Sequence, residues 1–383
     1  MRTFHRVTLA AFSAAVAGIV VAAMSGPINT AEGTVLRATH RAVPNSYIVT
    51  LASDASIGAL ADTYHAKVRH VYRTAIRGFS ATMTAAQARR LAADPRVLRV
   101  EEDAEAYALG TQLNPPSWGL DRIDQRLGLN NSYTYPNRAA SVTAYVIDTG
   151  IDLDHPEFGR IGVGIDVVGD GRNGDDCNGH GTAIAGIIGG ENYGVAKDVK
   201  LVSVRVLGCS GSGTISAVLA GVDWVTANAV KPAVANMSLG GVKNQTIDNA
   251  VARSIASGVT YSVAAGGSNF DACQFSPAGV PEAVTVGATD SSDRRASFSN
   301  YGPCLDIFAP GVNIATVWLD AGNIVLSGTS FAAAHVTGAA AMILEEHPDY
   351  TPAQVTDALI TNSTKDVVQN PGSGSPNRLL YVG

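Results

Sequence analysis

The spacing of apolar residues divides the chain into two parts. Between residues 43 and 107, short runs alternate between apolar and polar positions, which predicts half-buried strands. Thr84 and Gln87 make a capping-box pattern that begins a helix, and Asp94-Pro95 ends it. The predicted strands span 47–51, 68–72, 79–83 and 97–100, and an earlier helix spans 55–64. The order strand–helix–strand–strand–helix–strand predicts a small ferredoxin-like α+β domain over residues 43–108.

The second part begins after the linker signal Asn114-Pro115-Pro116. From Trp118 onward, apolar strands alternate with amphipathic helices. The predicted strands span 142–147, 199–207, 234–237 and 259–264, and the predicted helices span 215–225, 247–255 and 331–346, with a last helix beginning near Thr351. This alternation predicts an α/β domain over residues 113–383, with a doubly wound, mostly parallel sheet and helices on both faces.

The N-terminus has a different pattern from both parts. Arg2 and Arg6 precede an uncharged stretch from Val7 to Met24, and small residues lie at Ala22 and Ala23. This layout predicts a secretory signal peptide over residues 1–26. The alternative is a membrane anchor, because the stretch is just long enough to span a bilayer. Alanine-rich stretches insert weakly and no second apolar span follows, so we expect a secreted protein without stable membrane association.

Composition narrows the choice of function. A chain of 383 residues is long enough for two or more folded units, and a net charge of -6 with only 16% charged residues argues against a nucleic-acid binder. Four cysteines suit an exported protein. Their spacing allows three pairings, or free buried thiols, and the absence of a C-x-x-C pair argues against a zinc ribbon. The cysteines are Cys177, Cys209, Cys273 and Cys304.

Three residues have the chemistry of a nucleophilic hydrolase. Asp148 ends a predicted strand, His180 lies between two glycines, and Ser330 directly precedes a predicted helix. A histidine base can activate a serine, while an acid fixes the histidine tautomer. Each residue alone has a simpler interpretation: a turn aspartate, a packed histidine and a helix cap.

Two other hydrolase classes are disfavoured. The sequence Asp148-Thr149-Gly150 is also a signature of aspartic proteases, but that mechanism needs two such aspartates and only one occurs. An α/β-hydrolase would carry a G-x-S-x-G motif, which the sequence lacks.

In the order Asp, His, Ser, the chain resembles the subtilisin-like serine proteases, closest to the aqualysin-like enzymes of the proteinase K branch. The resemblance covers nearly everything after Trp118. The segment from Val43 to Tyr107 is similar to the inhibitory propeptide of that family. The matching segments are Arg77–Ala81, Asp94–Val97, Trp118–Asp124, Asn236–Gly241, Ser297–Gly302 and Pro376–Leu380.

The resemblance implies a catalytic triad of Asp148, His180 and Ser330. Two segments would hold the substrate backbone by strand addition, and a third would form a pocket wall favouring apolar or aromatic side chains before the scissile bond. The first two segments are Gly211, Ser212 and Gly213 and Ser238, Leu239 and Gly240, and the pocket wall is Ala264, Ala265 and Gly266.

The resemblance also implies features outside the reacting groups. It implies disulfides Cys177–Cys209 and Cys273–Cys304, and a structural calcium ion bound by the carbonyls of Pro281 and Ala283 and the carboxylate of Asp306. The chemistry itself would need no cofactor. We expect a monomer that acts on polypeptides, is inhibited by its own propeptide, and cuts itself between about Tyr107 and Asn114.

The sequence departs from the family at positions around the predicted site. Gly267 replaces the asparagine whose amide completes the oxyanion hole, Ala183 replaces a histidine, and residues 331–335 read Phe-Ala-Ala-Ala-His instead of Met-Ala-Thr-Pro-His. Asn269, two residues beyond Gly267, is expected to be a surface residue. Two functions therefore remain open: an active endopeptidase, or a weakened relative that binds peptides and turns them over slowly.

Overall fold

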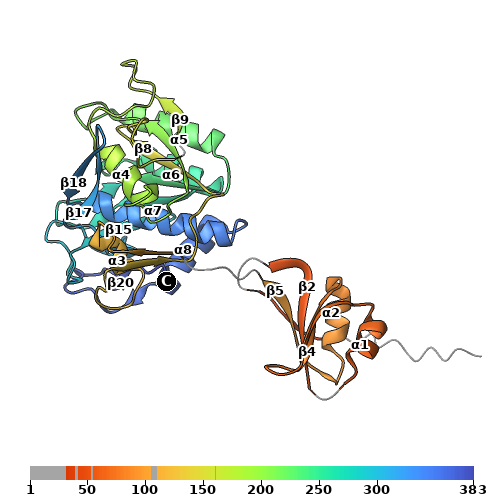
Figure 1. Cartoon of the computed structure of the whole chain (residues 1–383). Coiled ribbons are helices and arrows are strands. Elements are labelled where there is room, and N and C mark those ends of the chain that lie inside the picture. The colour runs from red at the N-terminus through yellow and green to blue at the C-terminus, as the bar shows by residue number, and fades with distance from the viewer. Residues whose placement is uncertain (1–31, 39–41, 53–54, 105–109, 160) are drawn as a thin grey trace, which may run out of the picture. The chain divides into compact units, whose positions relative to one another are not determined.

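The computed structural model describes residues 32–38, 42–52, 55–104, 110–159 and 161–383. The predicted signal peptide lies outside these residues. The chain forms two compact units, residues 1–105 and 106–383, and each is described here by itself (Figure 1). In the described part of the chain, no helix is long and apolar enough to cross a membrane.

The first unit is one five-stranded sheet with two helices. The sheet has the order β1-β5-β2-β4-β3, and it is antiparallel except where β1 joins β5. The capping box of Thr84 and Gln87 is present at the start of α2. The ferredoxin-like prediction is confirmed; β1 escaped prediction because two residues show no periodicity. The elements are β1 (Val35–Leu36), β2 (Ala42–Leu51), α1 (Ile57–Tyr64), β3 (Lys67–Tyr72), β4 (Gly78–Thr82), α2 (Ala85–Ala92) and β5 (Val97–Ala104).

The second unit is built on a nine-stranded sheet. Its order is β19-β20-β16-β15-β13-β11-β8-β10-β9, and only the β19–β20 pair is antiparallel. The doubly wound prediction is confirmed. The strands are β8 (Thr143–Asp148), β9 (Ile161–Asp166), β10 (Lys200–Arg205), β11 (Ala233–Met237), β13 (Thr260–Ala264), β15 (Val284–Thr289), β16 (Ile307–Pro310), β19 (Thr364–Lys365) and β20 (Arg378–Leu379).

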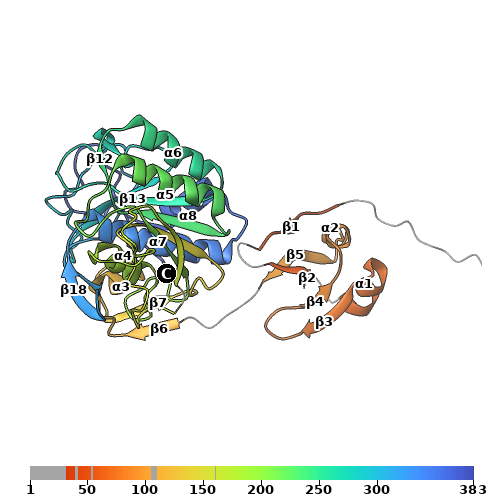
Figure 2. The same cartoon turned by 90° about the horizontal axis from the view of Figure 1, so that it is seen from above.

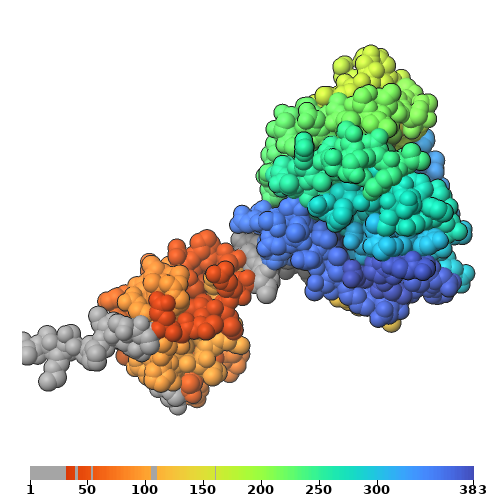
Figure 3. Space-filling model, turned by 180° about the vertical axis from the view of Figure 1, so that it is seen from behind, coloured from red at the N-terminus to blue at the C-terminus, as the bar shows by residue number. Residues whose placement is uncertain are grey.

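Helices cover both faces of this sheet (Figure 2). A separate hydrophobic cluster lies between the sheet and the helices on each face. Helices α3, α4, α7 and α8 contribute to the cluster on one face, and α5 and α6 contribute to the cluster on the other. In Figure 3, green-to-turquoise residues from the middle of the chain and blue C-terminal residues share one face of the unit. The helices are α3 (Trp118–Ile123), α4 (His180–Gly189), α5 (Ile215–Asn228), α6 (Gln245–Ala256), α7 (Thr329–Glu346) and α8 (Pro352–Asn362).

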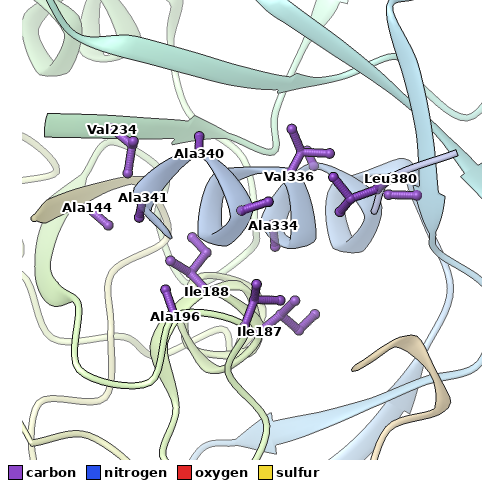
Figure 4. Close-up of a cluster of buried hydrophobic side chains, with 14 of the residues drawn as sticks. Ala144, Ile187, Ile188, Ala196, Val234, Ala334, Val336, Ala340, Ala341 and Leu380 are labelled. Atoms are coloured by element: carbon purple, nitrogen blue, oxygen red, sulfur yellow. The ribbon is translucent and has the colours of Figure 1, made fainter. Parts of the chain in front are cut away.

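Helix α7 passes through the larger core, and its buried surface consists mainly of small side chains. Ala340 and Ala341 lie close to Val234 of β11 and Ala144 of β8, and Ala334 lies further along the helix, in the same cluster as Ile187 and Ile188 of α4 (Figure 4). Small residues allow the helix backbone to approach its neighbours closely, which suits the dense packing of protein interiors.

Three short ladders and a 3-10 turn complete the unit. Strand β6 is an integral part of the second unit. Its four residues pair in register with Ser132–Tyr135, and Gln112 Nε2 donates a hydrogen bond to the Asn192 carbonyl at 2.9 Å. The elements are β6 (Gly110–Leu113) with β7 (Ser132–Tyr135), β12 (Gly241–Val242) with β14 (Phe275–Ser276), β17 (Ile314–Trp318) with β18 (Gly322–Leu326), and the turn Ala272–Gln274.

Candidate active site

Asp148 is the last residue of β8, at the carboxyl edge of the parallel sheet, where sites of α/β proteins form. Its side chain is fully buried. Oδ1 accepts a hydrogen bond from the Thr149 amide at 2.8 Å and lies 2.7 Å from His180 Nδ1. Within the described residues, Oδ2 is buried without a hydrogen-bond partner. The carboxylate is therefore held in place mainly through one oxygen.

Helix α4 begins against the turn that follows Asp148. The Gly181 amide donates to Thr149 Oγ1 at 2.9 Å, and a Cβ at position 181 would lie only 2.1 Å from the Gly150 carbonyl oxygen. Only glycine permits this approach of two backbones. The glycine after His180 thus lets the first residue of α4 reach the buried carboxylate.

The Asp148 carboxylate determines the state of His180. Because Nδ1 faces Asp148 Oδ1, the ring hydrogen lies on Nδ1 and leaves Nε2 as the basic nitrogen. Burial disfavours the protonated ring, but the charge and hydrogen bond of Asp148 outweigh burial and raise the pKa of His180 above its ordinary value of 6.5, with Asp176 acting in the same direction. The Asp148 carboxylate therefore favours the protonated, imidazolium form of the His180 ring.

Asp176 is a further residue of this site that sequence reasoning missed. One of its carboxylate oxygens accepts from the amides of Asn178 and Gly179, and the other accepts from the amide and hydroxyl of Thr182. These four bonds fix the segment that presents His180. The only available signal was an aspartate four residues before the histidine, the side-chain type that satisfies free amides at a helix start.

Ser330 lies in the first turn of α7. The helix begins at Thr329, one residue before the serine, instead of just after it as predicted, and Gly328 is the N-cap residue. The helix-cap interpretation of Ser330 is therefore wrong. In the described structure Ser330 Oγ donates to the Ser238 carbonyl at 3.2 Å and forms no hydrogen bond to His180. The ring of the next residue, Phe331, lies 5.9 Å from the His180 ring.

A cleft of about 540 Å³ joins His180 to both predicted backbone-binding segments. Its walls include residues 211–213 and 238–240, and apolar side chains of Leu207, Val218 and Ile247 contribute to the lining. The residues of the predicted pocket wall, 264–266, are not among those lining this cleft. They pack instead against the start of α7, where the Gly266 amide donates to Thr329 Oγ1 at 3.1 Å.

The loop that carries Gly267 is held by Asn300, which is fully buried. Asn300 Oδ1 accepts from the amides of Ser268 and Phe270, and Nδ2 donates to the Ala265 carbonyl. A Cβ at Gly267 would meet no atom within 4 Å. Asn269 is exposed, and its Oδ1 accepts from Arg295 at 3.0 Å. Space for a side chain therefore exists at 267, while Asn269 is engaged on the surface.

The residues of the implied calcium site are neighbours in the sheet. Ala283 directly precedes β15 and Pro281 lies two residues earlier, while Asp306 directly precedes β16, the strand that pairs with β15. Asp306 Oδ2 accepts from the Thr285 amide at 2.8 Å. Burial raises the pKa of the Asp306 carboxyl to about 6, and the Thr285 bond and the charge of Arg378 oppose this only in part. A half-buried carboxylate is an oxygen ligand of the kind that suits a hard cation such as calcium.

Two disulfides are formed, Cys177–Cys209 and Cys273–Cys304, the pairing that the resemblance implies. The first joins the segment before His180 to the segment before Gly211. Beside it, the fully buried Arg205 donates to Asp166 and Asp170 and to the Thr149 carbonyl. His335 is buried, and burial lowers its pKa to about 4, so it is a neutral packing residue.

The fold and this edge of the sheet define a class of protein: a serine hydrolase built on a doubly wound parallel sheet, with an acid–histidine pair and a serine in the first turn of a helix. Family comparison gives the same class. Residues 140–379 match the subtilase family model, and residues 35–108 match the peptidase inhibitor I9 model. The chain belongs to the subtilase family, and its first unit is an I9 propeptide.

Individual relatives are similar over most of the chain. An extracellular serine proteinase of Thermus sp. (strain Rt41A) is 55% identical over 83% of this chain and 78% of the relative. The alkaline serine exoprotease A of Vibrio alginolyticus is 48% identical over 85% of this chain, which spans 62% of that relative. The crystal structure of a cold adapted subtilisin-like serine proteinase matches with a TM-score of 0.68 and 53% identity, covering 70% of this chain and 98% of that one.

Proposed function

We propose that this chain is the precursor of a secreted serine endopeptidase in which Asp148, His180 and Ser330 form the catalytic triad. The observation that carries the proposal is the 2.7 Å contact between Asp148 Oδ1 and His180 Nδ1, together with the location of Ser330 in the first turn of α7. His180 Nε2 is thereby left free to act as a base. The resting Ser330 hydroxyl faces Ser238 and must rotate toward His180, as is common in unliganded sites.

The reaction proceeds through an acyl-enzyme. Ser330 Oγ attacks the peptide carbonyl carbon while His180 Nε2 takes its proton, and the tetrahedral intermediate then expels the amine, which receives that proton. A water molecule, activated by His180, then attacks the acyl-enzyme in the same way, and the carboxylic acid product leaves Ser330. The Ser330 amide, in the first turn of α7, is free of an intrahelical acceptor and is placed to donate to the oxyanion.

Substrate binding follows from the walls of the cleft. Segments 211–213 and 238–240 offer backbone groups on the two sides, which suits an extended peptide and makes few demands on its side chains. Ala264, Ala265 and Gly266 do not line this cleft, so the pocket wall for an apolar or aromatic side chain before the scissile bond is proposed from family membership alone. We therefore propose broad specificity with that preference.

The weakened relative remains the second candidate, because of one feature. Gly267 has no side chain to donate the second oxyanion hydrogen bond, and Asn269 is engaged with Arg295. The named relatives are proteinases, which favours an active enzyme. We propose an active endopeptidase whose rate is limited because its oxyanion hole has one hydrogen-bond donor fewer than that of other family members.

The remaining proposals concern the precursor. The I9 propeptide acts as an intramolecular inhibitor until the enzyme cuts itself, the N-terminal signal directs secretion, and the mature enzyme is a monomer. Pro281, Ala283 and Asp306 hold a calcium ion that stabilises the fold and takes no part in the chemistry.

The experiment is labelling of the secreted protein by a serine-directed phosphonate, followed by mass spectrometry of its peptides. We expect one label, on Ser330, and none on the Ser330→Ala variant. The labelling rate should rise with pH, because His180 acts as a base only when neutral, and the midpoint should lie above 6.5 because Asp148 raises the pKa of His180. A label elsewhere, or a rate independent of pH, would contradict the triad.

A further inference from the structure

A line of buried hydrogen bonds runs from α7 to β11 and back to the start of α7. Thr337 Oγ1 lies 3.0 Å from Asn236 Oδ1, Asn236 Nδ2 donates to Ser238 Oγ at 2.8 Å, and Ser238 Oγ donates to the Ser330 carbonyl at 2.9 Å. Thr337 and Asn236 are fully buried, and Ser238 is 6% exposed. The line therefore connects the third turn of α7 to the backbone of the candidate nucleophile through a neighbouring strand.

The bonds of this line have one direction. The Ser238 hydroxyl has a single hydrogen, and because Asn236 Nδ2 donates to its oxygen, that hydrogen is directed to the Ser330 carbonyl. The Asn236 amide has this orientation only while a donor faces its Oδ1, and Thr337 provides that donor. Hydrogen bonds arranged in series in a dry interior strengthen one another.

The Thr337 hydroxyl has two acceptors within reach, since the Ala333 carbonyl also lies at 3.0 Å. That carbonyl already accepts the Thr337 amide in the regular bonding of an α-helix. Asn236 Oδ1, in contrast, is fully buried, and a buried amide oxygen without a donor is left with an uncompensated cost of desolvation. The Thr337 hydroxyl therefore donates preferentially to Asn236 Oδ1.

Ser238 and Ser330 are also joined by a second bond, from Ser330 Oγ to the Ser238 carbonyl at 3.2 Å. This second bond must break during catalysis, because Ser330 Oγ has one hydrogen and must give it to His180. The bond from Ser238 Oγ to the Ser330 carbonyl then remains as the side-chain link between the two segments.

We infer that Asn236 and Thr337 are positioning residues, which hold the backbone of Ser330 through Ser238 while the Ser330 side chain turns to His180. The inference rests on the proposed function of Ser330. The two residues touch no substrate and act only on the geometry of the nucleophile. A displacement of a reacting group by about 1 Å can cost up to about 10²-fold in rate, so small shifts of Ser330 are measurable.

The test compares Thr337→Val, which keeps the shape and removes the hydroxyl, with Thr337→Ser, which keeps the hydroxyl. We expect Thr337→Val to lower kcat and the rate of phosphonate labelling at Ser330 together, by about three- to tenfold, with KM within about twofold. Thr337→Ser should retain most of the wild-type kcat. The melting temperature of each variant is measured alongside.

A matched control is Thr289→Val, because Thr289 is also fully buried and its hydroxyl donates to a backbone carbonyl, that of Ala309. The control should lose stability without losing labelling rate. If Thr337→Val does not fold, Asn236→Asp replaces it: the carboxyl keeps the acceptor for Thr337 and loses the donor to Ser238, and the same joint loss is expected.

The outcomes distinguish a failure of the proposed function from a failure of the positioning role of Asn236 and Thr337. Unlabelled Ser330 in the wild-type protein would overturn the proposed function and this inference with it. Normal labelling of the wild type together with unchanged kcat and labelling in Thr337→Val would overturn the inference alone. Equal losses in Thr337→Val, Thr337→Ser and Thr289→Val would also overturn it, because the loss would then follow general destabilisation.

Discussion

Among single residues, Gly267 is the one whose substitution is expected to raise the rate. Its backbone lies outside the left-handed region, and a side chain there would meet no atom within 4 Å, so an asparagine fits without strain. Removing the corresponding donor costs about 10²–10³ in kcat in subtilisin, a relative. We predict that Gly267→Asn raises kcat about tenfold at similar KM, since the added hydrogen bond forms mainly in the transition state.

Gly267→Ala is the control for this prediction, because it fills the same space without adding a donor. Steady-state kinetics on a peptide substrate should show no gain in kcat for the alanine variant. The assignment of a deficient oxyanion hole is wrong if Gly267→Asn leaves kcat at the wild-type value while Asn269→Ala abolishes it, because Asn269 would then be the donor.

Sequence reasoning succeeded for residues that lie in short motifs. Asp148, His180 and Ser330 were identifiable because glycines and turn residues around them make distinctive local sequences. Asp176, Asn236 and Asn300 were not assigned roles, because each acts through buried hydrogen bonds to backbone or side chains, and such partners leave no periodic pattern. Their roles depend on contacts between distant segments.

At the scale of elements, the two disulfides differ in what they join. They close similar loops, with sequence separations of 32 and 31 residues, so each should stabilise the protein by roughly 3–4 kcal/mol through chain entropy. Cys177–Cys209 also links the segment before His180 to the segment before Gly211. We predict that replacing either pair by serine lowers the melting temperature to a similar extent, and that only loss of Cys177–Cys209 also raises KM.

Calorimetry and peptide kinetics on the two double variants test this difference. The Cys273–Cys304 variant is the matched control, since no residue next to these cysteines in the sequence lines the cleft, whereas Asn178 and Gly211, close to the first disulfide, do. An unchanged KM in both variants would show that the first disulfide is not needed to hold the backbone-binding segment.

Long, periodic elements were predictable and short or irregular ones were not. The strand ending at Asp148 and the capped helix at Thr351 follow from apolar runs and capping residues. The two-residue strands β12 and β14 have no such pattern. Strand β6 directly precedes Asn114-Pro115-Pro116, and because that sequence is typical of a linker, no strand was predicted beside it. Helix α7 begins at Thr329 instead of Phe331, the start that was predicted. The N-cap residue is Gly328, which has no side chain to form a capping hydrogen bond, so no capping residue in the sequence marked this start.

At the scale of the whole molecule, strand β6 limits where the precursor can be cut. Its residues pair along their full length with β7, so a cut after Gly110 would disrupt a formed ladder. We predict that the enzyme cuts itself N-terminal to Gly110, within the first part of the range expected from sequence. Intact mass of the secreted product should show this terminus, and Ser330→Ala purified alone should remain uncut. Trimming of that variant at the same bond would exclude self-processing.

Calcium is expected to act on the stability of the second unit. Binding to the folded state alone stabilises it by mass action. We predict that a chelator lowers the melting temperature of the wild type and has little further effect on Asp306→Asn. Asp349→Asn, which changes an exposed aspartate elsewhere, should keep the full response to chelator. Equal responses of wild type and Asp306→Asn would place the ion elsewhere.

The small side chains of α7 have a consequence for the conformational entropy of the active site. Six alanines of this helix are buried, and alanine has no rotamers to lose on folding. The helix therefore enters the core at little side-chain entropy cost and has few alternative ways to pack once there. The helix that carries Ser330 is thus confined by close contact of its backbone with neighbouring elements rather than by large side chains that exchange between conformations.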